Sequence, residues 1–150
     1  MEDDEEDNFI LSLAFSRIGF PECVSFFPSS DALIKKLNQT TIQEYPDLIA
    51  VDCHMPRYSG GDLLILLKKH AKWRSIPVVL FSHNMNTKLR KKSMSLGAFA
   101  CLEKTSPDGG YMDLPQRLLE LTTWKNPGAK KVNGRKASKD KPICDSLKQN

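Results

Sequence analysis

Three polar side chains that could take part in chemistry follow apolar runs in this sequence of 150 residues. The runs and the residues after them are 48–51 with Asp52, 76–81 with Ser82, and 98–102 with Lys104. A carboxylate can act as a nucleophile. A hydroxyl and an ammonium group can hold the oxygens of a phosphoryl group during its transfer. The combination therefore favours phosphoryl transfer to Asp52.

An acidic cluster, Glu2-Asp3-Asp4-Glu5-Glu6-Asp7, precedes the first helical pattern. Clustered carboxylates repel one another unless a cation neutralises them. Mg²⁺ is the natural occupant of such a site, because it takes carboxylate and carbonyl oxygens as ligands. The cluster therefore adds a metal ion to the predicted chemistry.

Short apolar runs alternate with helical patterns along residues 1–124. Strands are expected at 23–27, 48–51, 76–81 and 98–102, and helices at 10–19, 29–37, 60–72, 86–96 and 114–124. Buried strands that alternate with helices need crossover connections, which predicts a parallel sheet covered on both sides. With four or five strands the sheet should be open and doubly wound rather than a barrel. Ligands bind outside the carboxyl ends of such strands, so the site should lie there.

Apolar spacing also predicts which helix positions lie against the sheet. These positions are Ile10, Leu13, Ala14 and Ile18 in the first helix, and Leu63, Leu64, Leu67 and Ala71 in the helix over 60–72. The basic residues of the helix at 86–96 predict a solvated face.

The net charge of +4 comes from the C-terminal part of the chain. Residues 125–150 hold eight Lys and Arg against two Asp, a net of +6, whereas residues 1–124 hold fourteen against sixteen acids, a net of −2. The segment 125–150 has no apolar periodicity, so we expect a disordered basic tail after a domain over 1–124. Basicity confined to a tail is weak support for specific nucleic-acid binding.

Cellular location is predicted from apolar runs and cysteine spacing. No apolar run reaches the roughly 18 residues of a membrane span, and the acidic start is unlike a signal peptide. The four cysteines include no C-x-x-C pair, which favours reduced thiols. We therefore expect a cytoplasmic protein without membrane contact.

Residues 46–56 resemble the strand-three motif of the receiver domains of two-component response regulators. The segment reads Pro46-Asp47-Leu48-Ile49-Ala50-Val51-Asp52-Cys53-His54-Met55-Pro56 and is followed by Gly60. Ser82 lies thirty positions after Asp52 and Lys104 fifty-two after it, and both separations are typical of the family. The resemblance covers about residues 2–124 and is closest in style to stand-alone bacterial receivers. It implies a flavodoxin-like, three-layer α/β/α fold.

The resemblance implies a role for each matched residue. Asp52 would accept a phosphoryl group from the phosphohistidine of a histidine kinase. The implied Mg²⁺ ligands are Asp3 and Asp52, with Glu2 contributing through water and His54 through its backbone carbonyl. Ser82 would move to hydrogen-bond one phosphoryl oxygen, and Lys104 would pair with another. We expect Asp4 to Asp7 only to place favourable negative charge at a helix N-terminus.

Three positions depart from the family pattern. The family has an apolar strand before its acidic pair, but only Met1 stands there, so we expect an N-terminally incomplete chain in which the strands at 23–27 and 48–51 flank a vacancy. Cys101 occupies the position where the family usually carries a switching Tyr or Phe. Thr105 replaces the usual proline, and the bond before it should be trans because a cis bond there would cost about 3 kcal/mol.

The predicted function depends on protein partners rather than on an external product, so we do not expect an enzyme. The expected partners are a sensor histidine kinase or phosphotransfer protein and an unidentified downstream protein, and a homodimer is left open. One alternative is a degenerate, non-phosphorylated interaction module, which Cys101 favours. The other is a phosphohydrolase with an aspartate nucleophile, which is disfavoured because His54 stands where that class usually carries a second acid.

Overall fold

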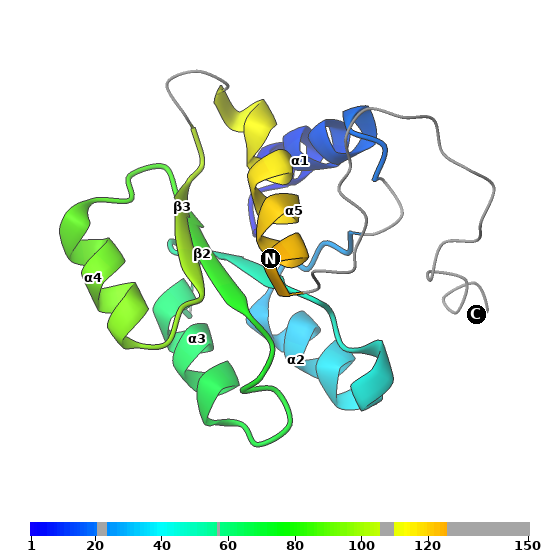
Figure 1. Cartoon of the computed structure of the whole chain (residues 1–150), viewed down its shortest axis with the longest axis vertical. Helices are drawn as coiled ribbons and strands as arrows, with labels where there is room; N and C mark the ends of the chain where they lie inside the picture. Colours follow the sequence, from blue (N-terminus) through cyan, green and yellow to red (C-terminus); the bar gives the residue numbers. More distant parts are fainter. Residues whose placement is uncertain (21–23, 57, 106–109, 126–150) are drawn as a thin grey trace.

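Three parallel strands form the middle layer of the protein, and helices cover both of its faces (Figure 1). The computed structural model describes residues 1–20, 24–56, 58–105 and 110–125. In chain order the elements are α1 (Glu5–Arg17), α2 (Ser30–Gln39), η2 (Ile42–Glu44), β1 (Ile49–Asp52), α3 (Gly60–Lys69), β2 (Val78–Ser82), α4 (Thr87–Ser95), β3 (Ala100–Glu103), η3 (Gly110–Asp113) and α5 (Leu114–Lys125). The predicted flavodoxin-like, doubly wound α/β class is confirmed.

The strands lie in the order β1-β2-β3, and both neighbouring pairs are parallel. In the register, Asp52 lies opposite Phe81 and Ser82 lies opposite Glu103. Because all three strands run in the same direction, their carboxyl ends meet at one edge of the sheet. This is the edge at which the sequence predicts the site.

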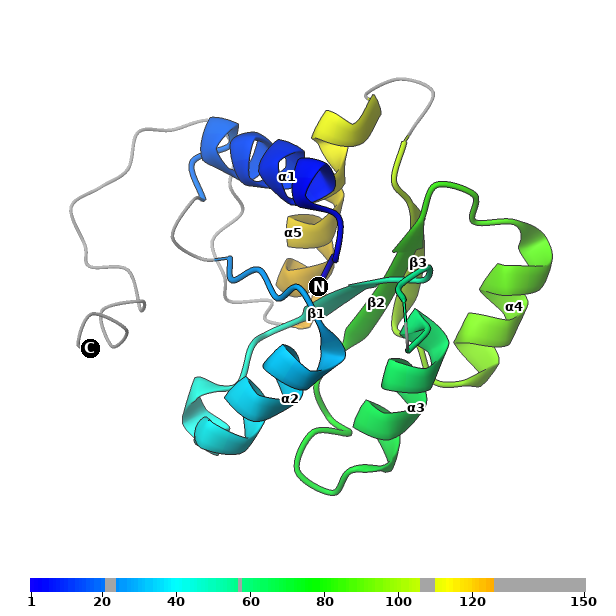
Figure 2. The same ribbon diagram turned by 180° about the vertical axis from the view of Figure 1, so that it is seen from behind.

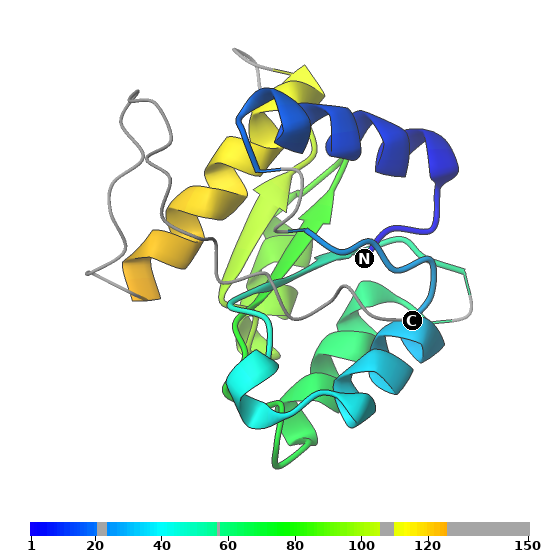
Figure 3. The same ribbon diagram turned by 90° about the vertical axis from the view of Figure 1, so that its right-hand side faces the viewer.

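Two apolar clusters pack against the sheet, between it and the helices that Figure 2 shows around it. Successive strand side chains alternate between the faces, so Leu80 joins one cluster while Val79 and Phe81 join the other. Leucines of α2 and α3 belong to the first cluster, and residues of α1 and α5 belong to the second. Figure 3 shows α1 and α5 on one side of the sheet and α2 and α3 on the other. The sheet is therefore buried on both faces, as the continuous apolar strands require.

The first helix buries a different face from the predicted one. Leu11, Ala14 and Phe15 are its buried residues, whereas Leu13 is 42% exposed. Ile10 and Ile18 are only partly buried. The prediction is confirmed for Ala14 but was wrong for Leu13, because Leu11 and Phe15 instead pack in the cluster that also contains residues of β2 and α5.

Most of the other predicted elements form, with shifted ends. Ser29 caps α2 by accepting a hydrogen bond from Ala32 N, and Asn86 caps α4 in the same way through Leu89 N. The α3 helix ends at Lys69 rather than at residue 72, and Ala71 is exposed in the following turn, so its predicted burial was wrong. Leu63, Leu64 and Leu67 are buried as predicted.

The strand predicted at 23–27 does not form within its described residues, 24–27, and Cys23 lies outside the described residues. Met1 and Glu2 lie between this segment and β1. Asp52 N donates to Met1 O at 3.1 Å, and Glu2 N donates to Phe27 O at 3.3 Å. Met1 N also donates to Ala50 O. These few bonds satisfy part of the β1 backbone edge that the sequence predicted to face a vacancy, but they are too few to build a strand.

Lys125, the first residue of the basic tail predicted over 125–150, ends α5 instead, and the remainder, 126–150 with Cys144, lies outside the described residues. Among the residues that the structure describes, every peptide bond is trans, including the one before Thr105. None of the helices in the described part of the chain is long and apolar enough to cross a membrane.

Candidate functional site

The three residues predicted to do chemistry lie together at the carboxyl edge of the sheet. Asp52 ends β1, Ser82 ends β2, and Lys104 directly follows β3. The backbone links their strands here, because Lys104 N donates to Ser82 O at 2.8 Å and Cys53 N donates to Phe81 O at 2.9 Å. All three side chains are buried. The fold therefore fixes their positions through the sheet itself.

The Lys104 ammonium lies among three carboxylates. Its Nζ is 2.6 Å from Asp52 Oδ2, 2.8 Å from Glu2 Oε2 and 2.6 Å from Asp7 Oδ2. The side chains of Lys104 and Glu2 are each only 2% exposed. A buried cluster of this kind stays charged only if its members are paired and hydrogen-bonded, which this geometry provides.

Burial and pairing act in opposite directions on the titration of this cluster. Burial by itself would lower the pKa of Lys104, but the hydrogen bonds to Asp52, Asp7 and Glu2 outweigh it and raise the pKa above the usual range. For Glu2, burial and the nearby Asp52 carboxylate raise the pKa, and the bond to Lys104 opposes them. The lysine therefore stays in its charged form, whereas burial and the neighbouring Asp52 carboxylate disfavour the charged form of Glu2.

Asp7 is a site residue that the sequence analysis missed. It was expected only to favour the N-terminus of α1, where Asp4 indeed accepts hydrogen bonds from Glu6 N and Asp7 N. Its side chain instead reaches Lys104, and its Oδ2 lies 3.7 Å from His83 Nε2. The available signal was its place in the first turn of a helix that starts beside Glu2.

Asp3, in contrast, does not join the carboxylate cluster. It lines a separate cavity of about 410 Å³, which Met1, Ser29 and Tyr58 also line. The Glu2 carboxylate is held in the cluster by Lys104 Nζ at 2.8 Å, and Asn8 Nδ2 donates to the backbone oxygen of Glu2 at 3.0 Å. The two neighbouring carboxylates therefore serve different sites.

The carboxylate cluster fits a divalent cation. Glu2, Asp7 and Asp52 each offer one oxygen, and these oxygens lie within 4.8 Å of one another. The Lys104 ammonium already supplies a positive charge between them, which shows that a cation is electrostatically favourable at this point. Oxygen-only ligands suit Mg²⁺ or Mn²⁺ better than softer metals.

His54 forms contacts with both Asp52 and Ser82. Its backbone N–H donates to Asp52 Oδ1 at 2.9 Å, and its ring Nδ1 lies 3.2 Å from Ser82 Oγ. Ser82 Oγ also accepts a hydrogen bond from Asn84 N at 3.2 Å. Only the backbone carbonyl of His54 was predicted to belong to the site, and the contact of its side chain with Ser82 was not predicted.

Gly60 allows the start of α3 to pass close to Asp52. A Cβ atom at this position would lie 2.2 Å from Asp52 O and 3.0 Å from Cys53 Cα, so no larger residue fits without a shift of the backbone. The helix start is fixed beside it by Ser59, which accepts a hydrogen bond from Asp62 N. The glycine in the sequence motif therefore has a packing reason.

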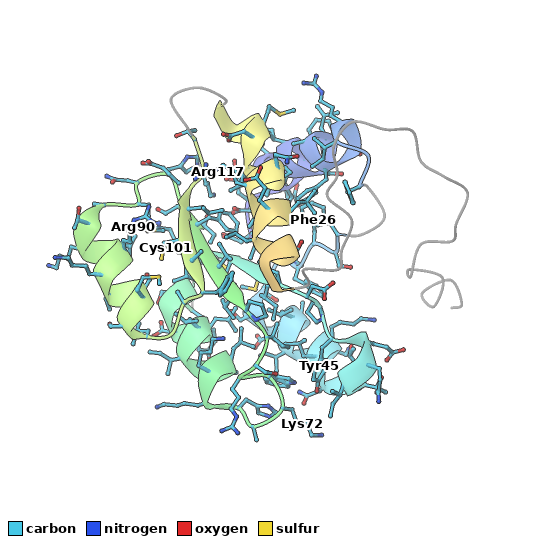
Figure 4. The ribbon with its side chains drawn as sticks, in the orientation of Figure 1. Phe26, Tyr45, Lys72, Arg90, Cys101 and Arg117 are labelled. Carbon is cyan, nitrogen blue, oxygen red and sulfur yellow. The ribbon has the colours of Figure 1, made fainter. Side chains whose placement is uncertain are left out.

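The two described cysteines are free and buried. Burial and the neighbouring Asp52 carboxylate raise the pKa of Cys53 to about 12, which leaves the thiol protonated and a poor nucleophile. Cys101 lies on β3 beside Arg90, whose Nη1 donates to Cys101 O at 2.6 Å (Figure 4). Burial also raises the pKa of Cys101. The arginine anchors α4 to β3 at the position where an aromatic residue was expected.

Comparison with solved structures supports the fold. The phosphorylated cyanobacterial phytochrome response regulator RcpA is 23% identical, with a TM-score of 0.68 over 85% of this chain and 91% of that chain. The response regulator RPA3017, described in red light signaling of R. palustris, is 23% identical, with a TM-score of 0.67 over 83% and 90% of the two chains. The Mn²⁺-bound form of the response regulator Rcp1 is 20% identical, with a TM-score of 0.59 over 79% and 87%. At these identities the likeness shows a shared fold.

Sequence comparison identifies the family. The hybrid signal transduction histidine kinase D of Dictyostelium discoideum is 29% identical over 125 residues. The match covers 83% of this chain but only 7% of that protein, so the chain corresponds to a small part of the relative. The model of the response regulator receiver domain matches residues 1–112. The chain therefore belongs to the response regulator receiver domain family.

Proposed function

We propose that this protein is a response regulator whose Asp52 accepts a phosphoryl group from a histidine kinase or a phosphotransfer protein, and which signals through protein contacts. The observation that carries the proposal is the buried contact of 2.6 Å between Asp52 Oδ2 and Lys104 Nζ at the carboxyl edge of the sheet. A carboxylate held against a fixed ammonium can receive a phosphoryl group whose new negative charge is neutralised at once.

The proposed transfer uses residues that the fold already positions. The Asp52 carboxylate attacks the phosphorus, the new O–P bond forms, and the N–P bond to the donor's histidine breaks. Lys104 pairs with one oxygen of the bound phosphoryl group, and the Ser82 hydroxyl donates to another. His54 N–H keeps the Asp52 carboxylate oriented through its bond to Oδ1. These groups bind and orient the phosphoryl group, which is the main task in this reaction.

A Mg²⁺ ion would be held by Glu2, Asp7 and Asp52, whose oxygens converge. The family resemblance adds the backbone carbonyl of His54 as a ligand, whereas Asp3, the other ligand it implies, lies outside the converging cluster. When bound, the ion neutralises the oxygens of the migrating group. The Mn²⁺-bound form of Rcp1 supports a divalent cation in this fold. We also propose the division into a receiver domain over 1–124 and a basic tail over 125–150, in a cytoplasmic protein.

The second candidate function is a non-phosphorylated interaction module. Cys101 favours it, because a small buried thiol replaces the aromatic side chain that usually reports the state of the site. A phosphohydrolase is less well supported, because the ring of His54 contacts Ser82 and offers no second carboxylic acid next to Asp52.

The test is modification of the purified chain with Mg²⁺ and either acetyl phosphate or beryllofluoride, followed by mass spectrometry or ¹⁹F NMR. We expect an adduct in the wild type and in Asp4→Asn, but none in Asp52→Asn. Asp4→Asn is a matched control because asparagine also caps helices well, so α1 should be preserved. Absence of any adduct would favour the interaction module, and steady turnover of phosphate esters would favour the hydrolase.

A further inference from the structure

The side chain of His54 contacts Ser82, the residue proposed to hydrogen-bond a phosphoryl oxygen. Ser82 is fully buried, and its Oγ lies 3.2 Å from Nδ1 of the exposed His54 ring. The same Oγ accepts a hydrogen bond from Asn84 N. His54 stands two positions after Asp52, the proposed phosphoacceptor, and also donates its backbone N–H to Asp52 Oδ1. His54 is thus bonded both to the residue that would be phosphorylated and to the residue that would respond.

We propose that the His54 imidazole is a positioning residue that restrains Ser82 in the unphosphorylated protein, with the Ser82 hydroxyl donating to Nδ1. This inference rests on the proposed function, in which Ser82 hydrogen-bonds a phosphoryl oxygen. A serine hydroxyl carries a single donor hydrogen. The hydrogen bond to His54 must therefore break before Ser82 can donate to the phosphoryl group, so His54 and the phosphoryl group compete for one proton donor.

A cavity beside His54 offers space for its side chain on the side of α4. The ring lines a cavity of about 240 Å³ between the start of α3 and α4, and Leu89, Ser93 and Leu96 of the α4 region line it too. After release from Ser82 the imidazole can turn into this space. Because α4 bounds the same cavity, this movement gives α4 a means to sense the state of Ser82.

The competition between His54 and the phosphoryl group for the Ser82 hydroxyl sets the affinity of the protein for a phosphoryl mimic. A ligand shifts a two-state equilibrium only by its differential affinity for the two states. The hydrogen bond from Ser82 to His54 stabilises the inactive arrangement alone, so its removal should raise the affinity for a phosphoryl mimic. A hydrogen bond with a net contribution of the usual size corresponds to a change of roughly three- to tenfold in affinity.

The test is a double-mutant cycle with beryllofluoride in excess Mg²⁺, measured by calorimetry. His54→Phe keeps a ring but removes both nitrogens, and it should bind beryllofluoride roughly three- to tenfold more tightly than the wild type. His54→Asn keeps an acceptor near the position of Nδ1 and should bind like the wild type. In a Ser82→Ala background, His54→Phe should no longer change the affinity. In the free protein, the ¹⁵N NMR signal of His54 Nδ1 should move when Ser82 is replaced by alanine.

The outcomes separate this proposal from the one on which it rests. Equal or weaker binding by His54→Phe, or the same gain in the Ser82→Ala background, would overturn the restraint while leaving the proposed function intact. An unchanged Nδ1 signal in Ser82→Ala would also overturn it. If the wild type forms no beryllofluoride adduct at all, both the proposed function and the restraint are refuted.

Discussion

Replacing Lys104 by methionine tests whether the carboxylate cluster depends on its internal cation. The substitution keeps a side chain of similar length but removes the ammonium group that contacts Glu2, Asp7 and Asp52 at 2.6 to 2.8 Å. It also leaves these three carboxylates without the buried charge that neutralises them. The expected result is a large loss of stability in the absence of a divalent cation.

The magnitude follows from the burial of the pair. Lys104 and Glu2 are each 2% exposed, so solvent screens the interaction little. Removing one partner of a buried ion pair costs about 3–5 kcal/mol, because the remaining charge stays buried and unpaired. Domains of this size have unfolding free energies of about 5–15 kcal/mol in total. The substitution should therefore lower the melting temperature by on the order of 10 °C.

The assay is urea unfolding of wild type and Lys104→Met at neutral pH, first with EDTA and then with Mg²⁺. Mg²⁺ should stabilise the variant more than the wild type, because the cation neutralises the same carboxylates that the lysine does. Acidification should also reduce the difference in unfolding free energy between the wild type and Lys104→Met. Burial already raises the pKa of Glu2, and loss of the opposing bond to Lys104 raises it further, so the folded variant binds a proton that the unfolded chain releases, and its relative stability grows as the pH falls.

The control is Lys91→Met on α4, where the lysine is exposed and the expected change is within about 0.5 kcal/mol. Suppose that Lys104→Met unfolds within about 1 kcal/mol of the wild type in EDTA at neutral pH. The carboxylates would then not depend on the lysine, and the reasoning above would be refuted. Equal stabilisation of both proteins by Mg²⁺ would show that lysine and metal ion do not share a site.

Three further predictions concern the same edge of the sheet. Gly60→Ala should lower the free energy of unfolding in urea by about 1–3 kcal/mol and weaken beryllofluoride binding, because its Cβ would lie 2.2 Å from Asp52 O. In the control Gly61→Ala the nearest atom to the new Cβ is at 3.6 Å, so this variant should be neutral or stabilising. Equal effects of the two substitutions would contradict the packing argument. Cys53, with its pKa raised to about 12, should react with iodoacetamide far more slowly in the folded protein than in urea near about pH 8, as peptide mapping would show; equal rates would contradict its burial. The stabilisation from Lys104 should be complete below the pKa of 10.5 that lysine has in the unfolded chain, and it should disappear as the pH rises through the higher pKa of the folded state. In urea unfolding at increasing alkaline pH, the free energy of unfolding should therefore fall more steeply for the wild type than for Lys104→Met.

The sequence by itself determined three strands of the middle layer, though not the one predicted at 23–27, and the set of polar residues at their ends. Apolar runs long enough to be buried on both faces appear as β1, β2 and β3, each within two residues of the predicted ends. Because parallel strands end at a common edge, a polar residue after each run had to lie near the others, and Asp52, Ser82 and Lys104 do. The helix starts at 29 and 86 were also predicted, and Ser29 and Asn86 cap these helices because capping depends on local sequence.

Only the tertiary structure decided which side chains complete the site. Glu2 and Asp3 are neighbours in the chain, yet only Glu2 reaches Lys104, whereas Asp3 lines a separate cavity. Asp7 and the His54 ring join the site through contacts with residues 97 and 28 positions away. The buried face of α1 was likewise decided by its packing against β2 and α5. Local sequence fixes which residues end a strand or cap a helix, but the rotation of a helix and the direction of a loop depend on the partners against which they pack.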